Sequence, residues 1–194
     1  MRRPGAWAAL ALLAALAIGC RSAAPEVFVP VMQTAAEQYA YALKFKESSR
    51  AELVTDKDKY EKAREVIMQT YAKVPENFPD DRQFTPLAKL DIIDMRCGFD
   101  SQRVKLEGRE QERVMHQAIR DLADLAQKYP ENEQVQAKTL YDRGMCHKAL
   151  GEFNKMQEYF KALIDKYSKS LDSTIQNLAR RADYFYKHTY VKGE

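Results

Sequence analysis

Residues 137–168, AKTLYDRGMCHKALGEFNKMQEYFKALIDKYS, decide the fold. Apolar side chains recur at helical spacing on both sides of Gly151, and this pattern predicts two helices joined by a glycine turn. The second of these helices opens with Phe153, has Met156 three places later, and has Phe160 four places after that. The stretch therefore predicts a helical hairpin.

The same internal register occurs three times in the chain. Each copy starts with an aromatic residue or Met. A second marked position follows three places after it, an apolar residue follows seven places after it, and a residue that ends the pattern follows fifteen places after it. The copies are Tyr60–Ala63–Ile67–Pro75, Met115–Ala118–Leu122–Pro130 and Phe153–Met156–Phe160–Ser168. A fixed register of this kind indicates a helical-repeat solenoid, a class that mostly binds other proteins with its surface.

The 137–168 stretch resembles a tetratricopeptide repeat. Five positions carry the resemblance, namely Leu140 and Gly144 in the first helix, Gly151 in the turn, and Phe153 and Phe160 in the second helix. Met156 and Ser168 stand where the family usually has alanine and proline. The other copies keep those residues, as Ala63 with Pro75 and Ala118 with Pro130, but their first helices do not align at the family spacing.

The resemblance implies an all-α, tetratricopeptide-like right-handed solenoid of about three helix hairpins with a C-terminal capping helix. A plain antiparallel helical bundle is the alternative. Helical periodicity predicts helices over Val31–Arg50, Asp58–Lys73, Pro86–Lys105, the segment from Gly108 to Tyr129, Glu133–Leu150, Glu152–Tyr167 and Ser173–Tyr190. Pro75 and Pro79 are expected to end the second helix, and Gly98 to weaken the middle of the third.

The N-terminus has the pattern of an export signal. Arg2 and Arg3 precede an apolar run from residue 6 to residue 18, which is short for a membrane span. The segment Leu16–Cys20 resembles a bacterial lipobox, in which Cys20 would be lipidated. We therefore expect a signal peptide at 1–19, a lipidated tether at 20–30 and the helical-repeat domain at 31–190. An ordinary signal peptide or an uncleaved anchor is the alternative.

Charge and cysteine content narrow the functional classes. The net charge of +3 falls to about +1 once Arg2 and Arg3 are removed, and no concentrated basic face suggests nucleic acid as a partner. Export would permit a disulfide between Cys97 and Cys146, but no spacing specifies such a bridge, and we expect small buried thiols that fill gaps between helices. No phosphate loop, nucleophile motif or metal-ligand spacing is present, so the sequence predicts neither an enzyme nor a cofactor.

The tetratricopeptide resemblance also implies a binding face. In that family the exposed positions of the first helices line a concave groove, and these correspond to Lys138, Tyr141, Met145 and Lys148. We expect this groove to bind an extended or helical peptide of acidic character. A solvated face with an incidental aromatic residue is the alternative.

The lipobox and the repeats together are similar to the tetratricopeptide lipoproteins of barrel assembly in the outer membrane. Segments 128–132 and 166–170 add to this likeness. The resemblance implies a lipid-anchored interaction scaffold or adaptor of the bacterial cell envelope, held at the periplasmic face of the outer membrane and binding a protein partner. A structural or non-catalytic subunit in cell-wall or envelope organisation is the alternative.

Overall fold

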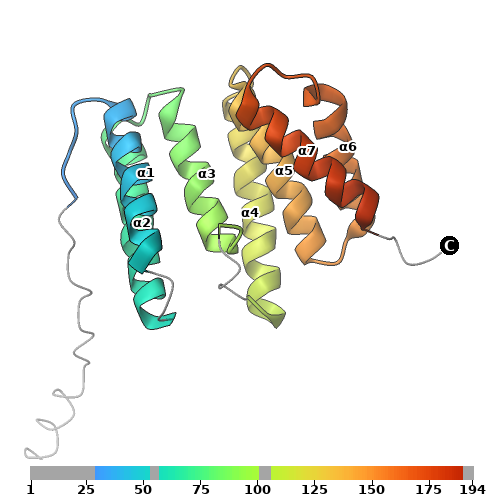
Figure 1. Cartoon of the computed structure of the whole chain (residues 1–194), viewed down its shortest axis with the longest axis horizontal. Coiled ribbons are helices and arrows are strands. Elements are labelled where there is room, and N and C mark those ends of the chain that lie inside the picture. Colours follow the sequence, from blue (N-terminus) through green and yellow to red (C-terminus); the bar gives the residue numbers. More distant parts are fainter. Residues whose placement is uncertain (1–28, 53–56, 101–105, 190–194) are drawn as a thin grey trace, which may run out of the picture.

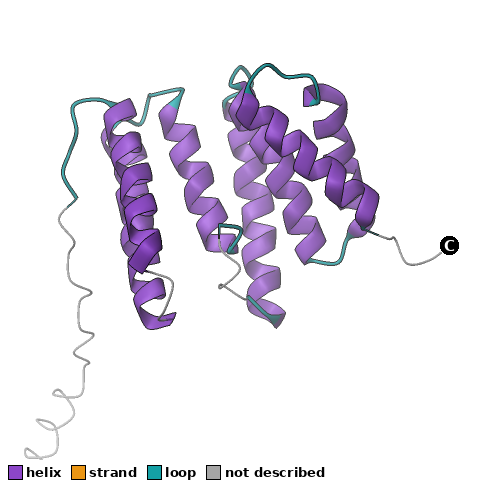
Figure 2. Cartoon of the chain, in the orientation of Figure 1, coloured by secondary structure: helices purple, strands orange, loops and turns teal. Residues whose placement is uncertain are grey.

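The structure is a computed structural model that describes residues 29–52, 57–100 and 106–189. These ranges contain seven helices and no strand (Figure 2). The helices are α1 Ala35–Glu52, α2 Lys57–Asn77, α3 Phe84–Cys97, α4 Gly108–Lys128, α5 Glu133–Ala149, α6 Phe153–Tyr167 and α7 Ser173–His188. The expected all-α class is therefore confirmed. The predicted signal peptide, Cys20 and nearly all of the tether lie outside the described residues.

The helices form a row of antiparallel neighbours, as Figure 1 shows. Three hydrophobic clusters hold the row together. One joins α1, α2 and α3, the next joins α3, α4 and α5, and the last joins α5, α6 and α7. Because α3 and α5 each contribute to two clusters, every hairpin completes the core of its neighbour. Packing of each hairpin against its neighbours in this way is typical of a helical-repeat stack.

The tightest helix crossing in the stack lies between α5 and α6. Gly144 is buried and Phe160 is fully buried, and a Cβ added at Gly144 would lie only 2.4 Å from a ring carbon of Phe160. The aromatic ring therefore fills the space that glycine leaves open. Met156 is also fully buried, so it acts as a core residue rather than as a slim contact. Two of the five positions that carry the tetratricopeptide resemblance therefore meet at this crossing.

Gly98 ends α3, which corrects the expectation of a helix reaching Lys105. Gly98 has a φ of 73°, its N–H donates to the carbonyl of Met95, and the N–H of Phe99 donates to the carbonyl of Asp94. This double hydrogen bond is a Schellman motif, in which glycine takes the left-handed position after the last helical turn. Gly151 ends α5 in the same way, with a φ of 74° and the corresponding bonds to Lys148 and His147.

Pro75 lies inside α2, so the expectation that it ends this helix was wrong. Its ring removes one backbone donor, but it sits in the last turn, where few further helical bonds depend on it. The N–H of Phe78 still donates to the carbonyl of Val74 at 2.9 Å. The helix ends at Asn77, just before Pro79. Pro130, by contrast, follows the end of α4 as predicted.

Side-chain caps explain two helix starts that periodicity placed wrongly. Thr34 and Glu37 exchange side-chain bonds with each other's backbone N–H, so this capping box starts α1 after Thr34 rather than at Val31. The carboxylate of Asp81 accepts from the N–H groups of Phe84 and Thr85, and it starts α3 two residues before Pro86. Asp81 therefore caps the start of α3 with its side chain.

The C-terminal helix α7 covers the end of the stack, in agreement with the predicted capping role. Ile175, Ala179 and Ala182 are buried against α5 and α6, and the ring of Phe185 stacks on that of Phe160 at 6.0 Å. Among the described helices, none combines the length and apolar character that crossing a bilayer requires.

The two cysteines meet inside the central cluster as free, buried thiols. A hydrogen bond between them, together with burial, raises the pKa of the Cys146 thiol well above its ordinary value. A thiol of this kind is a packing element rather than a reactive group.

Candidate binding groove

The four residues predicted to line a concave groove all make contacts within the fold. Tyr141 retains only 4% of its exposure, its ring stacks on Phe160 at 5.7 Å, and the guanidinium of Arg181 lies 4.9 Å from its centre. The expectation that Tyr141 is an exposed position was therefore wrong. The physical reason is α7, which folds back onto α5 and places Arg181 over the ring.

The other three residues of that face are partly buried. Met145 packs against the third hydrophobic cluster, and the ammonium group of Lys148 lies 4.1 Å from the ring centre of Phe185. Lys138 donates to the carboxylate of Asp142 at 3.0 Å and also to that of Asp94. Whether a partner binds here stays a prediction, but the side chains expected to contact it are engaged within the protein.

Polar contacts join the three first helices, α1, α3 and α5, along this face. Tyr39 of α1 donates its hydroxyl to Asp91 of α3 at 2.8 Å, whereas Asp94 of α3 faces Lys138 of α5. Burial and the neighbouring carboxylate of Asp94 raise the pKa of Asp142, although Lys138 opposes the shift. Burial lowers the pKa of Lys138, but the carboxylates of Asp142 and Asp94 raise it by more than burial lowers it. The net pKa is therefore raised, and the ammonium group stays charged.

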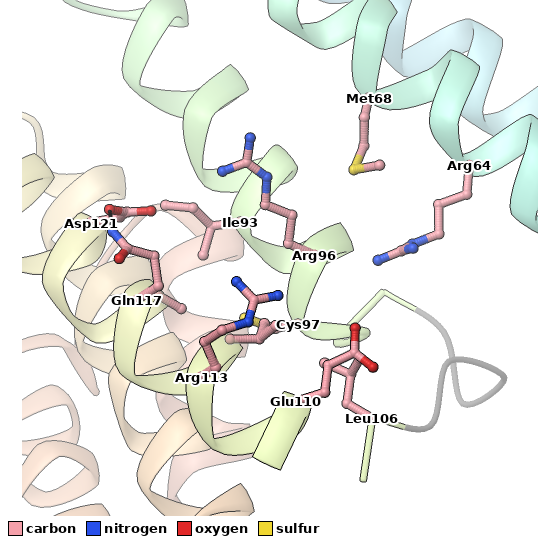
Figure 3. Close-up of a pocket in the computed structure, with 12 residues that line it drawn as sticks. Arg64, Met68, Ile93, Arg96, Cys97, Leu106, Glu110, Arg113, Gln117 and Asp121 are labelled. Carbon is pink, nitrogen blue, oxygen red and sulfur yellow. Dashed lines mark hydrogen bonds between the residues drawn. The ribbon is translucent and has the colours of Figure 1, made fainter. Parts of the chain in front are cut away.

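An open hollow lies elsewhere, between the second helices α2 and α4 and across the end of α3. Its volume is about 400 Å³. Figure 3 shows Arg64 and Met68 extending from α2 toward this space, with Arg113 facing them from α4. The apolar floor includes Ile93 and Ala118, both of which are buried core residues.

A second hollow of about 310 Å³ continues the first along α3 and α4. The two share Ile93, Arg96 and Asp121, so they form one elongated depression, which we call the α2–α4 groove. Lys89 and Lys128 extend its cationic lining. Burial and the positive charge of Lys128 lower the pKa of Lys89, as expected where cations are held close together.

Five cationic and three anionic side chains line the α2–α4 groove. The cations are Arg64, Arg96, Arg113, Lys89 and Lys128, and the anions are Glu110, Asp121 and Asp124. Within the described part of the chain, no ion pair joins these cations to these carboxylates. Asp121 instead accepts a hydrogen bond from the amide of Gln117 at 2.7 Å. The groove therefore presents a surplus of positive charge.

One of these cations is held in place by the fold. The Nε of Arg64 donates to the carbonyl of Met95 at 3.0 Å, and a second nitrogen of the same guanidinium donates to the same oxygen. This carbonyl lies in the last turn of α3, where backbone oxygens need partners from outside the helix. Arg64 thereby ties α2 to the end of α3 at the edge of the groove.

Unequal helix lengths explain why the groove is open. The short helix α3 has 14 residues, whereas α2 and α4 have 21 each, so its neighbours are roughly 10 Å longer. Most residues that line the larger hollow come from the C-terminal end of α3 and from the first two thirds of α2 and α4, and Leu106 just precedes α4. Among the described residues, α3 does not continue past Cys97 alongside those two helices.

Sequence reasoning missed the α2–α4 groove. Each of its arginines belongs to a helix of mixed charge, where a solvated side chain is the ordinary interpretation, and nothing in their spacing brings Arg64 together with Arg113. One local signal could have indicated the groove. If Gly98 had been interpreted as the end of the third helix, the sequence would have predicted that this helix is shorter than its neighbours. No group of three or more potential metal ligands occurs in the residues that the structure describes.

The fold and its surface define a class of protein, an all-α stack of helical hairpins with an open groove between second helices. Comparison with known families makes the class more specific for one segment. Residues 138–170 match the family described as Tetratricopeptide repeat, which confirms the resemblance at the α5–α6 hairpin where it was predicted. Comparison with curated proteins and with solved structures found no match.

Proposed function

We propose that this protein is a lipid-anchored interaction scaffold of the bacterial cell envelope, which binds a polypeptide partner in the α2–α4 groove. The observation that carries the proposal is the open groove on a tetratricopeptide-like stack, because this class generally mediates contacts between proteins. Its surface has both an apolar floor and charged rims, the usual anatomy of an interface. In this role the chain is non-catalytic and needs no cofactor.

The proposed anchor is Cys20, which follows the lipobox-like Leu16–Gly19 segment. Three acyl chains on a lipoprotein cysteine would hold the protein stably, since more than one chain is needed for a durable membrane anchor. The stretch between Cys20 and the start of α1 at Ala35 would serve as the tether. This arrangement would present the helical stack at the periplasmic face of the outer membrane.

The test of partner binding is photo-crosslinking in cells that express the full-length chain. A photoreactive amino acid replaces Gln117, an exposed residue of the groove, or Glu158, an exposed residue of α6 as the matched control. We expect a defined protein adduct from position 117 and none from position 158. Equal crosslinking at both positions, or no adduct at 117, would contradict the proposed groove.

The identity of the crosslinked partner separates two roles. Unfolded outer-membrane barrels would support an adaptor in barrel assembly, whereas peptidoglycan enzymes would support a structural subunit of cell-wall organisation. Both roles use the same stack and the same anchor. Mass spectrometry of the crosslinked adduct therefore decides between them, because its peptides identify the partner protein.

The anchor is tested independently of the partner. Cys20→Ala should abolish incorporation of a labelled fatty acid and release the protein from the membrane fraction. Globomycin, which blocks lipoprotein signal cleavage, should leave an uncleaved precursor of the unsubstituted chain. Normal maturation in the presence of the drug would remove the lipid anchor from the proposal while leaving the groove unaffected.

A further inference from the structure

We propose that the α2–α4 groove recognises an acidic peptide segment that carries a large apolar side chain. This inference rests on the proposed scaffold function and deepens it by naming the chemistry of the partner. The apolar side chain would enter the hollow between α2 and α4, and flanking carboxylates would pair with the arginines at its rim.

The apolar part of the argument comes from the floor of the groove. Met68, Leu106 and Val114 are half-buried, and they surround the covered Ile93 and Ala118. A hollow of about 400 Å³ lies within the size range of sites that enclose small ligands, so it accommodates a buried anchor side chain with its neighbours. Half-buried apolar groups gain from losing their remaining contact with water.

The charged part comes from the rim. Arg96 and Arg113 are exposed, they come from different helices, and neither forms an ion pair with a described residue. Planar guanidinium groups suit carboxylates because they donate two parallel hydrogen bonds. Arg64 is already bound to the carbonyl of Met95, so its role is to hold one wall of the groove.

The shape and the mixture of charges favour a peptide over other anions. The second hollow extends the groove along α3 and α4, so an elongated occupant can lie across both. Glu110, Asp121 and Asp124 interrupt the cationic lining, and they would repel a polymer with a negative charge at every unit. A peptide can place apolar or neutral residues opposite those carboxylates.

The test is fluorescence anisotropy with purified full-length protein and three labelled peptides of equal length. In the first, Asp and Glu flank Leu and Phe. In the second, Lys replaces every acidic residue, and in the third, Ser replaces Leu and Phe. We expect the first peptide to bind at least roughly tenfold more tightly than either of the others, with affinity falling as salt is raised.

Charge reversal identifies the surface that binds. Arg96→Glu combined with Arg113→Glu should weaken binding of the first peptide by about tenfold or more. The matched control, Lys169→Glu with Arg180→Glu, reverses two exposed charges outside the groove and should change affinity less than about twofold. Circular dichroism checks the fold of both variants, and the peptide comparison on unsubstituted protein decides the matter if a variant does not fold.

Three results would overturn the proposal. These are equal binding of the acidic and the Lys-substituted peptides, equal loss in the two double variants, and tighter binding of single-stranded nucleic acid or anionic vesicles than of the acidic peptide. A protein adduct at position 117 together with any of these results would preserve the scaffold function and reject only the acidic recognition. The absence of that adduct would reject the groove itself.

Discussion

At the scale of single residues, the contact between Gly144 and Phe160 determines how closely α5 and α6 approach. A Cβ at position 144 would lie far inside contact distance of a ring that has no exposed surface and little room to move. Gly144→Ala should therefore destabilise the protein by about 1–3 kcal/mol, because the packed ring must shift. Urea unfolding followed by circular dichroism measures this change.

The matched control for this prediction is Gly151→Ala. Nothing lies near an added Cβ at Gly151, so only its left-handed φ of 74° resists the change. The cost should come from backbone strain of about 1 kcal/mol rather than from overpacking. If Gly144→Ala left the stability unchanged, the close crossing of α5 and α6 would be contradicted.

Asp142 supplies a second prediction at this scale, concerning pH. Burial and the neighbouring Asp94 raise the pKa of its carboxyl group in the folded protein. Between the unfolded and folded pKa values, the folded state holds more protons than the unfolded state. The contribution of Asp142 to the free energy of unfolding therefore falls as pH rises through this window.

Asp142→Asn keeps a neutral polar group at this position and cannot ionise. The free energy of unfolding of the variant, relative to the unsubstituted protein, should rise as pH increases from the pKa of a free carboxyl toward neutrality. Denaturant unfolding at a series of pH values measures this difference. A difference that stays constant or falls with pH would show that folding does not raise the pKa of Asp142.

At the scale of elements, Gly98 sets the length of α3 and so the opening of the groove. Its left-handed conformation lets the backbone close the Schellman motif, and any residue with a Cβ is strained there. Gly98→Ala should lower the free energy of unfolding by about 1 kcal/mol. Thermal or urea unfolding checks the cost, and a variant as stable as the original would contradict this helix end.

Element boundaries show what the sequence could and could not predict. Seven helices and the glycine turn at Gly151 were predictable because periodicity and a glycine between two apolar stripes are local signals. Gly98 was misinterpreted because apolar residues recur on both sides of it. Pro75 was misinterpreted because a proline in the last turn removes little from a helix that is about to end.

The caps at Thr34 and Asp81 were also visible in principle. Thr34 and Glu37 have the spacing of a capping box, and Asp81 precedes an apolar helix by the distance of an N-cap.

The candidate site, in contrast, could not be predicted from local sequence patterns. The α2–α4 groove depends on α3 being shorter than both of its neighbours, and the burial of Tyr141 depends on where α7 folds back, which no local pattern reports.

At the scale of the whole molecule, three hydrophobic clusters share α3 and α5 and so join the hairpins into one stack. On the face formed by α1, α3 and α5, several polar side chains contact one another, as Tyr39 and Asp91 do, while Asp94 Oδ1 and the Tyr141 hydroxyl are buried without a hydrogen-bond partner among the described residues. Between α2 and α4, in contrast, arginine side chains border an open hollow with an apolar floor (Figure 3). This exposed combination of arginines and apolar side chains is why we propose the α2–α4 groove as the interaction surface.

Hydrogen–deuterium exchange of the full-length protein, alone and with its crosslinked partner, tests this account most directly. Bound partner should slow exchange at the C-terminal end of α3 and in the first two thirds of α2 and α4. The segment 138–148 of α5 should exchange at the same rate in both samples. Protection confined to 138–148, or protection nowhere in the stack, would contradict the α2–α4 groove as the interaction surface.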